Sequence, residues 1–373
     1  MLNIKQYNLK KLNISLILVV MVLVVTGASL IHIVKPRLFT KQIIGIMLGM
    51  CVCFVLTFID YHLVCNYSLI LYAIGVILLL LIQVPGLGSG YNGSIRWIKI
   101  GDLFTIQPSE ICKIIMIIVL AQLLTQFNES INNIKTLGII IGVVSLPVLL
   151  IFIQPDLSSS LVLIFFFVIM LYYAGISYKI IIPAFAMMVP TVAIVIWYVC
   201  QPYQKIIKSY QQKRILGLFY PDLFPDIMFQ QNKSVDMIER GKLYGILDGS
   251  STENLTCKRL PIVESDFIFT SVGEVVGFIG SFVIIALLMV LVFKCFSIAR
   301  NARDFTGKMI CTGVSALFMF QIFANIGVVT RLLPNTGLPL PFLSYGVSAL
   351  FSYFAAIGIV LNVGLQGKTV SRG

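Results

Sequence analysis

The chain has 373 residues, of which 58% are hydrophobic and only 11% are charged, and its formal net charge is +12. Such an apolar composition excludes a soluble globular domain. The positive charge would suggest nucleic acid in a soluble protein, but no basic and aromatic domain separates from the apolar segments. We therefore expect membrane lipid, with anionic head groups, to face these cations, and no nucleic acid.

Apolar runs near the length needed to cross a bilayer recur along most of the chain. Lipid offers no hydrogen-bond partners, so runs of this length indicate helices and not barrel strands. We expect an all-α polytopic membrane protein of about ten transmembrane helices, organised as one integral membrane domain over residues 1–373. The runs lie at residues 14–34, 42–59, 68–84, 108–125, 136–154, 157–175, 178–200, 267–293, 309–331 and 342–365.

The first run is long for a signal-peptide core and is followed by no small-residue cleavage pattern, so we interpret it as a retained span. An even number of spans places both termini on one side, and the basic loop at 294–308 predicts that this side is cytoplasmic. Under this topology Lys35, Arg37 and Lys41 of the short first loop fall outside, against the positive-inside rule.

The eight cysteines show no metal-ligand spacing, so free thiols are expected. A disulfide between Cys200 and Cys257, both expected outside, is the alternative. A divalent cation stays open as a cofactor, although the sequence offers no ligand set for one.

A glycine-rich stretch at 86–101 follows the third run and carries Arg96, Trp97 and Lys99. One interpretation is an interfacial anchor, with the indole at the membrane surface and the cations reaching head groups. The other is a ligand-binding turn. Both remain open from the sequence.

The fourth run opens with Pro108, and Glu110 and Lys113 follow one helical turn apart on one face. An ion pair facing lipid is costly, so this face should look into the bundle as a structural clamp or as part of a site. Between the fifth and sixth runs, Asp156 follows Pro155 and either caps the next helix or adds a second carboxylate to a polar site.

Residues 201–265 form the one long segment that the apolar runs leave between them, and we expect a large extracytoplasmic loop. It mixes aromatic residues with cations, so we expect it to fold onto the membrane surface. At its end, Asp266 stands at the mouth of an apolar helix, where it is either a cap or a chemical group. Glu274 follows two turns later, and the spacing predicts that both carboxylates share one face.

The segment 331–346 contains three prolines and two glycines, which exclude a regular helix. Irregular backbone near membrane depth is tolerated where protein or a cavity covers it. We therefore expect a re-entrant or cavity-lining loop that presents Ser344 and Tyr345.

Taken together, six motifs resemble the SEDS family (shape, elongation, division and sporulation), which includes RodA, FtsW and SpoVE. Each motif alone is weak, but they occur in order and cover nearly the whole chain. They are Gly93–Gly101, Gln107–Lys113, Gln154–Leu157, Tyr210–Ile215 with Arg214, Asp266–Phe269 and Pro334–Gly346. Compared with the family pattern, Val347 replaces a glycine, Ser158–Ser160 replace Gly-Thr, and Arg240–Gly245 is a remnant of a longer glycine-rich run.

The resemblance implies a peptidoglycan glycosyltransferase that polymerises lipid II, an undecaprenyl-pyrophosphate-linked disaccharide peptide, together with a class B penicillin-binding protein. It implies that Asp266 is the catalytic residue. A carboxylate in a partly apolar site suits a general base, and the pyrophosphate leaving group needs cations. The side chains that we expect around the substrate are Arg96, Trp97, Glu110, Lys113, Asp156, Arg214, Glu274, Ser344 and Tyr345.

Two other functions stay open from the sequence. A flippase or other transporter of lipid II also carries broken helices and intramembrane charges, although no internal repeat pairs two such helices here. A scaffold that only activates a penicillin-binding protein would need the spans but not Asp266.

Overall fold

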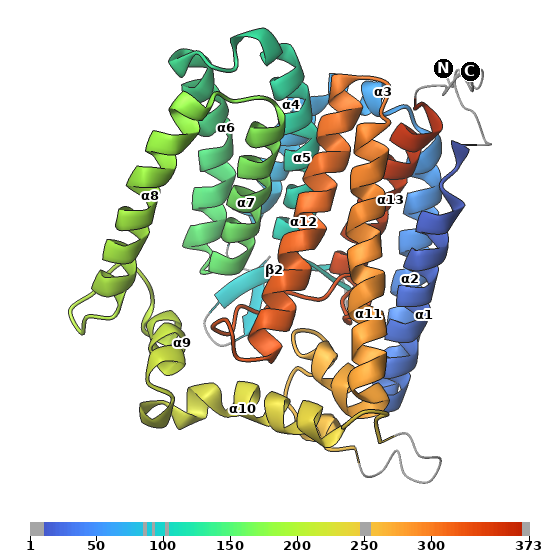
Figure 1. The fold of residues 1–373 in the computed structure, drawn as a ribbon, viewed down its shortest axis with the longest axis vertical. Helices are drawn as coiled ribbons and strands as arrows, with labels where there is room; N and C mark the ends of the chain where they lie inside the picture. Colours follow the sequence, from blue (N-terminus) through green and yellow to red (C-terminus); the bar gives the residue numbers. More distant parts are fainter. Residues whose placement is uncertain (1–10, 85–87, 92–93, 101–103, 247–254, 368–373) are drawn as a thin grey trace.

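Ten apolar helices form the body of the molecule in the computed structural model, which describes residues 11–84, 88–91, 94–100, 104–246 and 255–367 (Figure 1). Within these residues, eight helices are long and apolar enough to cross a membrane, and two apolar helices, α4 and α7, are shorter. The predicted helical membrane fold is confirmed. The ten helices are α1 (Ile14–Val34), α2 (Pro36–Phe58), α4 (Ser68–Leu81), α5 (Pro108–Gln126), α6 (Ile134–Ile153), α7 (Leu157–Tyr173), α8 (Tyr178–Val199), α11 (Ile268–Arg300), α12 (Phe305–Val329) and α13 (Val347–Leu365).

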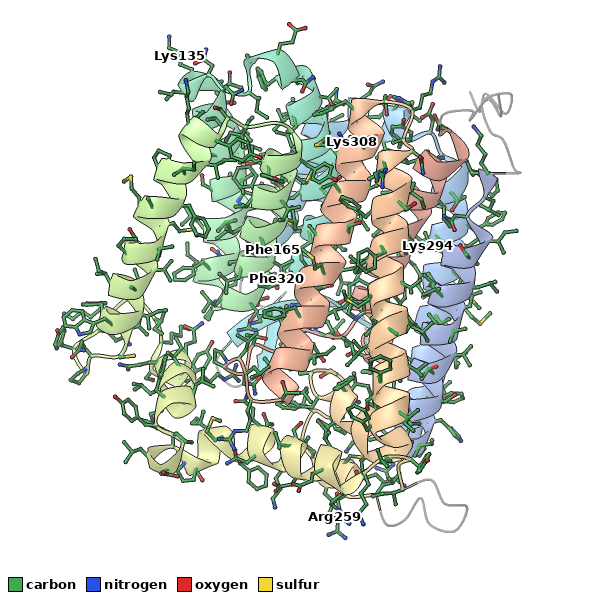
Figure 2. All side chains as sticks on the ribbon, viewed as in Figure 1. Lys135, Phe165, Arg259, Lys294, Lys308 and Phe320 are labelled. Carbon is green, nitrogen blue, oxygen red and sulfur yellow. The ribbon has the colours of Figure 1, made fainter. Side chains whose placement is uncertain are left out.

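Helix α12 lies at the centre of the bundle and packs against α5, α7, α11 and α13. The ring centroids of Phe165 on α7 and Phe320 on α12 are 4.9 Å apart, between the two helices, and both side chains are half-buried (Figure 2). Helix α8 instead stands away from the body in Figure 1, and Val199 at its end is its one buried residue. An apolar helix of this kind is expected to face lipid on nearly all sides.

Several helix boundaries differ from the prediction, and among the helix starts those of α2 and α13 differ the most. Helix α2 begins at Pro36 instead of residue 42, because proline is well suited to the first helical position. Helix α13 begins at Val347 instead of residue 342, because Phe342 has a φ of +64° and the backbone N–H of Tyr345 donates to the carbonyl of Glu264. The residues before Val347 therefore belong to the preceding loop.

A small antiparallel sheet follows α4, and the sequence did not predict it. Its strands are β1 (Gly88–Tyr91), β2 (Ser94–Ile100) and β3 (Phe104–Ile106), in the order β1-β2-β3. Residue Ser89 pairs with Trp97, and Ile98 pairs with Ile106. The expected turn at 86–101 thus contains a strand that carries Arg96 and Trp97, while Gly86, Gly93 and Gly101 lie outside the described residues.

The segment after α8 folds into short helices, α9 (Ser209–Phe219), η4 (Pro221–Leu223), α10 (Pro225–Arg240) and η6 (Cys257–Arg259). Helix α10 runs across one end of the bundle in Figure 1 and packs against α11. Its buried residues are Met228, Gln231, Ser234 and Met237, at helical spacing, so one face covers the bundle and the other is exposed.

The loop between α12 and α13 has no helix, as predicted, and residues 340–344 of it are buried. The ring of Phe342 packs between Tyr353 and Phe354 of α13, with centroid distances of 5.6 and 5.4 Å. Leu343 passes so close to α1 that a Cβ on Gly27 would lie 2.7 Å from its Cα. Irregular backbone at this depth is thus covered by protein, as the lipid environment requires.

The first and last described residues, Lys11 and Gly367, lie at the end of the molecule opposite α10 (Figure 1). There the Lys11 ammonium donates to the carbonyl of Gly367 at 2.7 Å. Lys135 and Lys308 lie at this end and Arg259 at the other (Figure 2). All eight cysteines are free, so the alternative of a Cys200 to Cys257 disulfide is wrong.

A histidine clamp joins the short helix α3 (Tyr61–Asn66) to the start of α12 at the end where the termini lie. His62 Nδ1 lies 2.8 Å from Asp60 Oδ1, and Nε2 lies 2.8 Å from Asp304 Oδ2. The hydrogen bond to Asp304, and then that to Asp60, raise the pKa of His62. Burial alone would raise the pKa of Asp304, but hydrogen bonds from His62 and Tyr61 lower it to about 2.

We expect this clamp to make stability depend on pH. The pKa of His62 is higher in the folded chain, so its contribution is fully present below the unfolded pKa of about 6.5 and is lost as pH rises through the folded value. The pair is partly exposed, so the loss should be at most about 1 kcal/mol. Thermal unfolding in detergent across this range checks the prediction. His62→Gln should flatten the dependence and His32→Gln should retain it, whereas equal slopes in both variants would contradict the clamp.

Candidate active site

Asp266 stands in the last turn before α11 and is partly buried. The helix begins at Ile268, its N-cap is Phe267, and no side chain caps it. The alternative that Asp266 is merely a helix cap is therefore wrong. Its carboxylate is free of the helix end and available for another task.

Three hydrogen bonds hold the backbone around Asp266. Asn325 of α12 donates from Nδ2 to the carbonyl of Asp266 at 2.8 Å and to the carbonyl of Leu338 at 2.7 Å. The hydroxyl of Ser344 donates to the carbonyl of Ser265 at 2.5 Å. The backbone N–H of Tyr345 donates to the Glu264 carbonyl at 2.7 Å. Residues 264–266 are thus fastened to α12 and to the loop before α13.

Burial raises the pKa of Asp266 to about 6, although the Ser265 hydrogen bond and the positive charges of Arg214 and Arg96 act in the opposite direction. Gly337 faces the carboxylate with a φ of +72°, and a Cβ there would lie 3.2 Å from Asp266 Oδ2. Glycine adopts this backbone conformation at little cost and leaves space beside the carboxylate. A carboxylate with a pKa near 6 is ionised at neutral pH and still basic enough to accept a proton.

Arg214 approaches this site from α9. Its Nη1 donates to the carbonyl of Asn335 at 3.2 Å, and its guanidinium lies 5.7 Å from the ring centroid of Tyr210. Burial lowers the pKa of Arg214 the most, and the charge of Arg96 lowers it as well. The charges of Tyr210 and Asp266 raise it. A guanidinium remains protonated under such shifts, so Arg214 supplies a fixed positive charge.

Arg96 reaches the same region from strand β2. Its Nη1 lies 3.7 Å from Asp156 Oδ1, and Nη2 donates to the carbonyl of Pro155. Tyr210 and Gln211 of α9 also donate to this carbonyl, at 3.4 and 3.5 Å. The turn between α6 and α7 is therefore the point where β2 and α9 meet.

Asp156 has both roles that the sequence left open. It caps α7 by accepting from the backbone N–H of Ser159 at 3.3 Å, and it accepts from Gln107 Nε2 at 3.3 Å. It also forms the ion pair with Arg96. Asp156 is buried and held in place by these bonds, so its charge fixes the orientation of the Arg96 guanidinium.

The predicted ion pair between Glu110 and Lys113 is confirmed, at 2.6 Å inside the bundle. Only 2% of Glu110 and 1% of Lys113 is exposed. Lys113 is therefore closed to a bound substrate in this structure. We assign the pair to clamping α5.

The prediction that Glu274 shares a face with Asp266 is wrong, because Asp266 precedes the helix. Glu274 is fully buried and accepts from the backbone N–H of Thr256 at 2.9 Å, from the Thr256 hydroxyl at 2.6 Å and from the N–H of Cys257 at 2.7 Å. It anchors the η6 segment to α11.

Two other predicted site residues, Ser344 and Trp97, do not point at the Asp266 carboxylate. Ser344 is buried and, besides holding Ser265, accepts from the backbone N–H of Leu340 at 2.8 Å. Trp97 is partly exposed on β2, and its side chain points to the face opposite that of Arg96, because alternate residues of a strand face opposite ways. Trp97 therefore lies on the strand that carries Arg96, with its side chain directed away from that of Arg96.

The shortened glycine run is used for close packing. Helix α11 is kinked at Gly277, whose φ is +66°, and the segment 241–245 crosses the kink. A Cβ on Gly241 would lie 1.9 Å from the Gly273 carbonyl oxygen, and one on Gly245 would lie 2.1 Å from the Val275 carbonyl oxygen. The backbone N–H of Phe278 donates to the carbonyl of Lys242 at 2.8 Å. The remnant thus keeps the glycines that the contact needs.

Sequence reasoning missed Asn325, which connects the Asp266 turn to the following loop. The available signal was a single asparagine within an apolar span, which is expected to have an internal hydrogen-bond partner. Among the described residues, no three His, Cys, Asp or Glu side chains gather as a metal site.

Known proteins resemble this chain over nearly all of its length. A family model for FtsW, RodA and SpoVE, described as "Cell cycle protein", matches residues 4–369. Stage V sporulation protein E of Bacillus subtilis is 34% identical over 87% of this chain and 86% of its own length. The probable peptidoglycan glycosyltransferase FtsW of Trichlorobacter lovleyi is 31% identical, over 96% and 94% of the two chains.

Solved structures share the fold. A chain from a structure titled "Structural coordination of polymerization and crosslinking by a peptidoglycan synthase complex" superposes with a TM-score of 0.81 at 24% identity, covering 96% of this chain and 97% of that one. The rod shape determining protein RodA of Thermus thermophilus gives a TM-score of 0.69 at 22% identity, with 96% of each chain covered.

Proposed function

Because the chain belongs to the FtsW, RodA and SpoVE family of cell cycle proteins, we propose that it is a peptidoglycan glycosyltransferase that polymerises lipid II. The observation that carries the proposal is the Asp266 carboxylate, whose pKa burial raises to about 6 beside the positive charges of Arg214 and Arg96. Two relatives of the chain, the FtsW proteins of Trichlorobacter lovleyi and Wigglesworthia glossinidia, are named as probable peptidoglycan glycosyltransferases.

In the proposed reaction a sugar hydroxyl attacks the anomeric carbon of a sugar linked to undecaprenyl pyrophosphate. Asp266 accepts the hydroxyl proton as the new carbon–oxygen bond forms and the bond to the pyrophosphate breaks. The guanidiniums of Arg96 and Arg214 stabilise the negative charge that develops on the leaving group. Asp156 and the carbonyl of Pro155 hold Arg96 in place for this task.

We propose that the active site faces outward and that both termini are cytoplasmic. Two features support this orientation: Lys11 and Gly367, the first and last described residues, lie at the end opposite α10, and Lys308 lies at the same end (Figures 1 and 2). The basic loop between α11 and α12 is then inside, in keeping with the positive-inside rule. Reporter fusions at residue 373 test the orientation, since only a cytoplasmic C-terminus gives a fluorescent reporter and an inactive periplasmic phosphatase.

A class B penicillin-binding protein is the partner that we propose, to crosslink the strands. A similar fold in a peptidoglycan synthase complex supports this. Purified chain in vesicles with fluorescent lipid II, with and without that partner, tests the function. Glycan strands are expected, whereas lipid II that crosses the bilayer without polymerising would indicate a transporter.

The pH dependence of polymerisation should report the ionisation of Asp266. The base works only when ionised, so the rate should rise with pH through about 6 and then level off. Arg214 lowers the pKa of Asp266 by its charge, so Arg214→Gln should move the midpoint to higher pH as well as slow the reaction. Single-turnover rates from pH 5 to pH 8 check this. Lys213→Gln removes an exposed charge next to it and should leave the midpoint unchanged, and an equal shift in both variants would contradict the assignment.

A further inference from the structure

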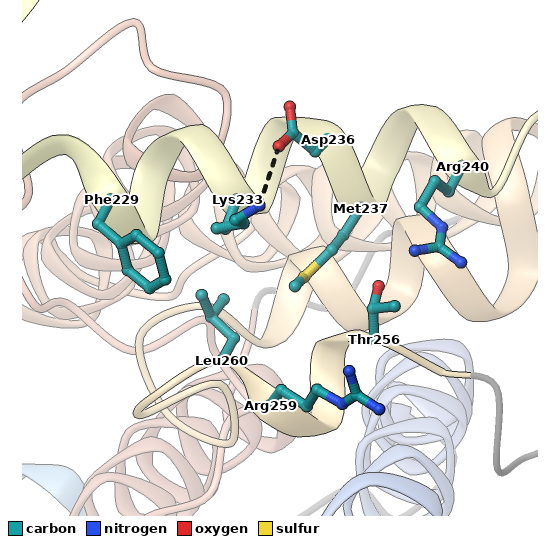
Figure 3. Close-up of a pocket in the computed structure, with 8 residues that line it drawn as sticks. All are labelled: Phe229, Lys233, Asp236, Met237, Arg240, Thr256, Arg259 and Leu260. Atoms are coloured by element: carbon teal, nitrogen blue, oxygen red, sulfur yellow. Dashed lines mark ion pairs between the residues drawn. The ribbon is translucent and has the colours of Figure 1, made fainter. Parts of the chain in front are cut away.

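A pocket separate from the Asp266 site opens between α10 and η6, with a volume of about 380 Å³ (Figure 3). Its apolar wall consists of Phe229 and Met237 of α10 and Leu260 after η6. A pocket of this size accommodates a small polar group with a short apolar extension. It is too small for a whole lipid.

The charged wall of the pocket has more cations than anions. Lys233 faces Asp236 at 3.9 Å, and both side chains are half exposed. Arg240 and Arg259 lie on opposite sides of Thr256, from α10 and from η6 (Figure 3). Neither guanidinium forms an ion pair with another described residue, so two like charges face one opening. An anion between them would relieve their repulsion and accept hydrogen bonds from both.

The pocket lies at the level where the membrane surface is expected. Lys35, which joins α1 to α2, donates from Nζ to the carbonyl of Lys258 at 3.3 Å. Segment η6 therefore rests on the end of the α1 and α2 hairpin, whose helices expose apolar side chains such as Leu18 and Phe54 along their length. Polar head groups begin where such lipid-facing helices end.

The same corner carries the cations that contradict the positive-inside rule. Arg37 and Lys41 follow Lys35 in the first turns of α2, on the side that we propose to be outside. Basic residues in a short outer connection are disfavoured unless something there compensates their charge. An anionic head group provides that compensation, because its negative charge attracts cations at the membrane surface.

We propose that this pocket binds the phosphodiester head group of an anionic phospholipid. Arg240 and Arg259 contact the phosphate, because guanidinium groups bind phosphate oxygens in pairs. Phe229, Met237 and Leu260 contact the glycerol and the first methylenes of the acyl chains. Such a lipid would connect α10 to η6, and this site does not depend on the proposed catalysis.

Native mass spectrometry of the purified full chain with phosphatidylglycerol or phosphatidylcholine tests the site. We expect wild type to retain phosphatidylglycerol in preference. Arg240→Gln with Arg259→Gln should weaken that binding by at least about tenfold, since two charge-assisted hydrogen bonds are lost. The matched control is Arg300→Gln with Arg303→Gln, which removes the same charge from exposed positions near the other end and should bind like wild type.

Two further outcomes would overturn the proposal. Equal retention of both lipids by wild type, or equal weakening in the two double variants, would mean that the pocket does not select an anionic head group. Inorganic phosphate or glycerol phosphate at the lipid's concentration is a second arm of the test. Full displacement of phosphatidylglycerol by either would assign the pocket to a soluble phosphate. Melting curves of both double variants, matching wild type without added lipid, show that each is folded.

Discussion

Asp266→Asn is expected to abolish lipid II polymerisation while the chain remains folded. Asparagine has nearly the same size as aspartate but cannot accept the hydroxyl proton, and general-base catalysis contributes about 10²- to 10⁴-fold to a rate. The backbone bonds from Asn325 and Tyr345 do not involve the carboxylate, so they remain. Single-turnover polymerisation measures the loss, and Asp266→Ala should show a loss of similar size.

The matched control is Asp222→Asn, which changes an exposed carboxylate in the same long loop. It should polymerise lipid II like wild type. Thermal unfolding of all three variants shows that the protein is intact. Full activity of Asp266→Asn would remove Asp266 from the chemistry, whatever the other residues contribute.

Glu110→Gln should be the most damaging substitution for stability among those considered. It leaves the Lys113 ammonium buried, 1% exposed, without its carboxylate at 2.6 Å. Removal of one partner of a buried ion pair typically costs about 3–5 kcal/mol. The melting temperature of the variant in detergent should therefore fall strongly, and expression should fall with it.

A double variant separates the cost of the unpaired charge from any other role of the pair. Glu110→Leu with Lys113→Met replaces both groups by apolar side chains of similar volume, which is often neutral or stabilising. It should melt near wild type. If it folds but polymerises no lipid II, the pair has a function in the site besides clamping α5. A normal melting temperature for Glu110→Gln alone would contradict the assignment of the Glu110–Lys113 ion pair to clamping α5.

Much of the fold could be predicted because lipid permits few backbone structures. Long apolar runs had to be helices, and the three prolines between 331 and 346 had to form a covered loop. Local signals also placed Pro108 at a helix start and Asp156 at a cap, since both depend on neighbours in sequence.

The errors came from regions where short-range patterns say little. Strand β2 depends on pairing with two other short strands, which the glycine-rich sequence did not reveal. The prediction that Asp266 and Glu274 share a face assumed that Asp266 is part of the helix. Helix α11 begins at Ile268, so the helical spacing does not apply to Asp266. Helix boundaries are among the least certain features of a sequence pattern.

Long-range contacts were equally invisible. His62 meets Asp304 across 242 residues, and Asn325 meets Asp266 across 59. No local spacing links such pairs, because the bundle alone brings them together. Arg96 and Arg214 could be proposed from the sequence because they lie in recognisable motifs, and their charges act on Asp266 in the structure, whereas Lys113 is enclosed.

The most direct test of the central claim is a gel ladder of glycan strands made from fluorescent lipid II by the purified wild-type chain with a class B penicillin-binding protein. We expect a ladder with wild type and none with Asp266→Asn under the same conditions. Absence of a ladder from folded wild type, or an identical ladder from both, would contradict the assignment of Asp266 as the base of a glycosyltransferase.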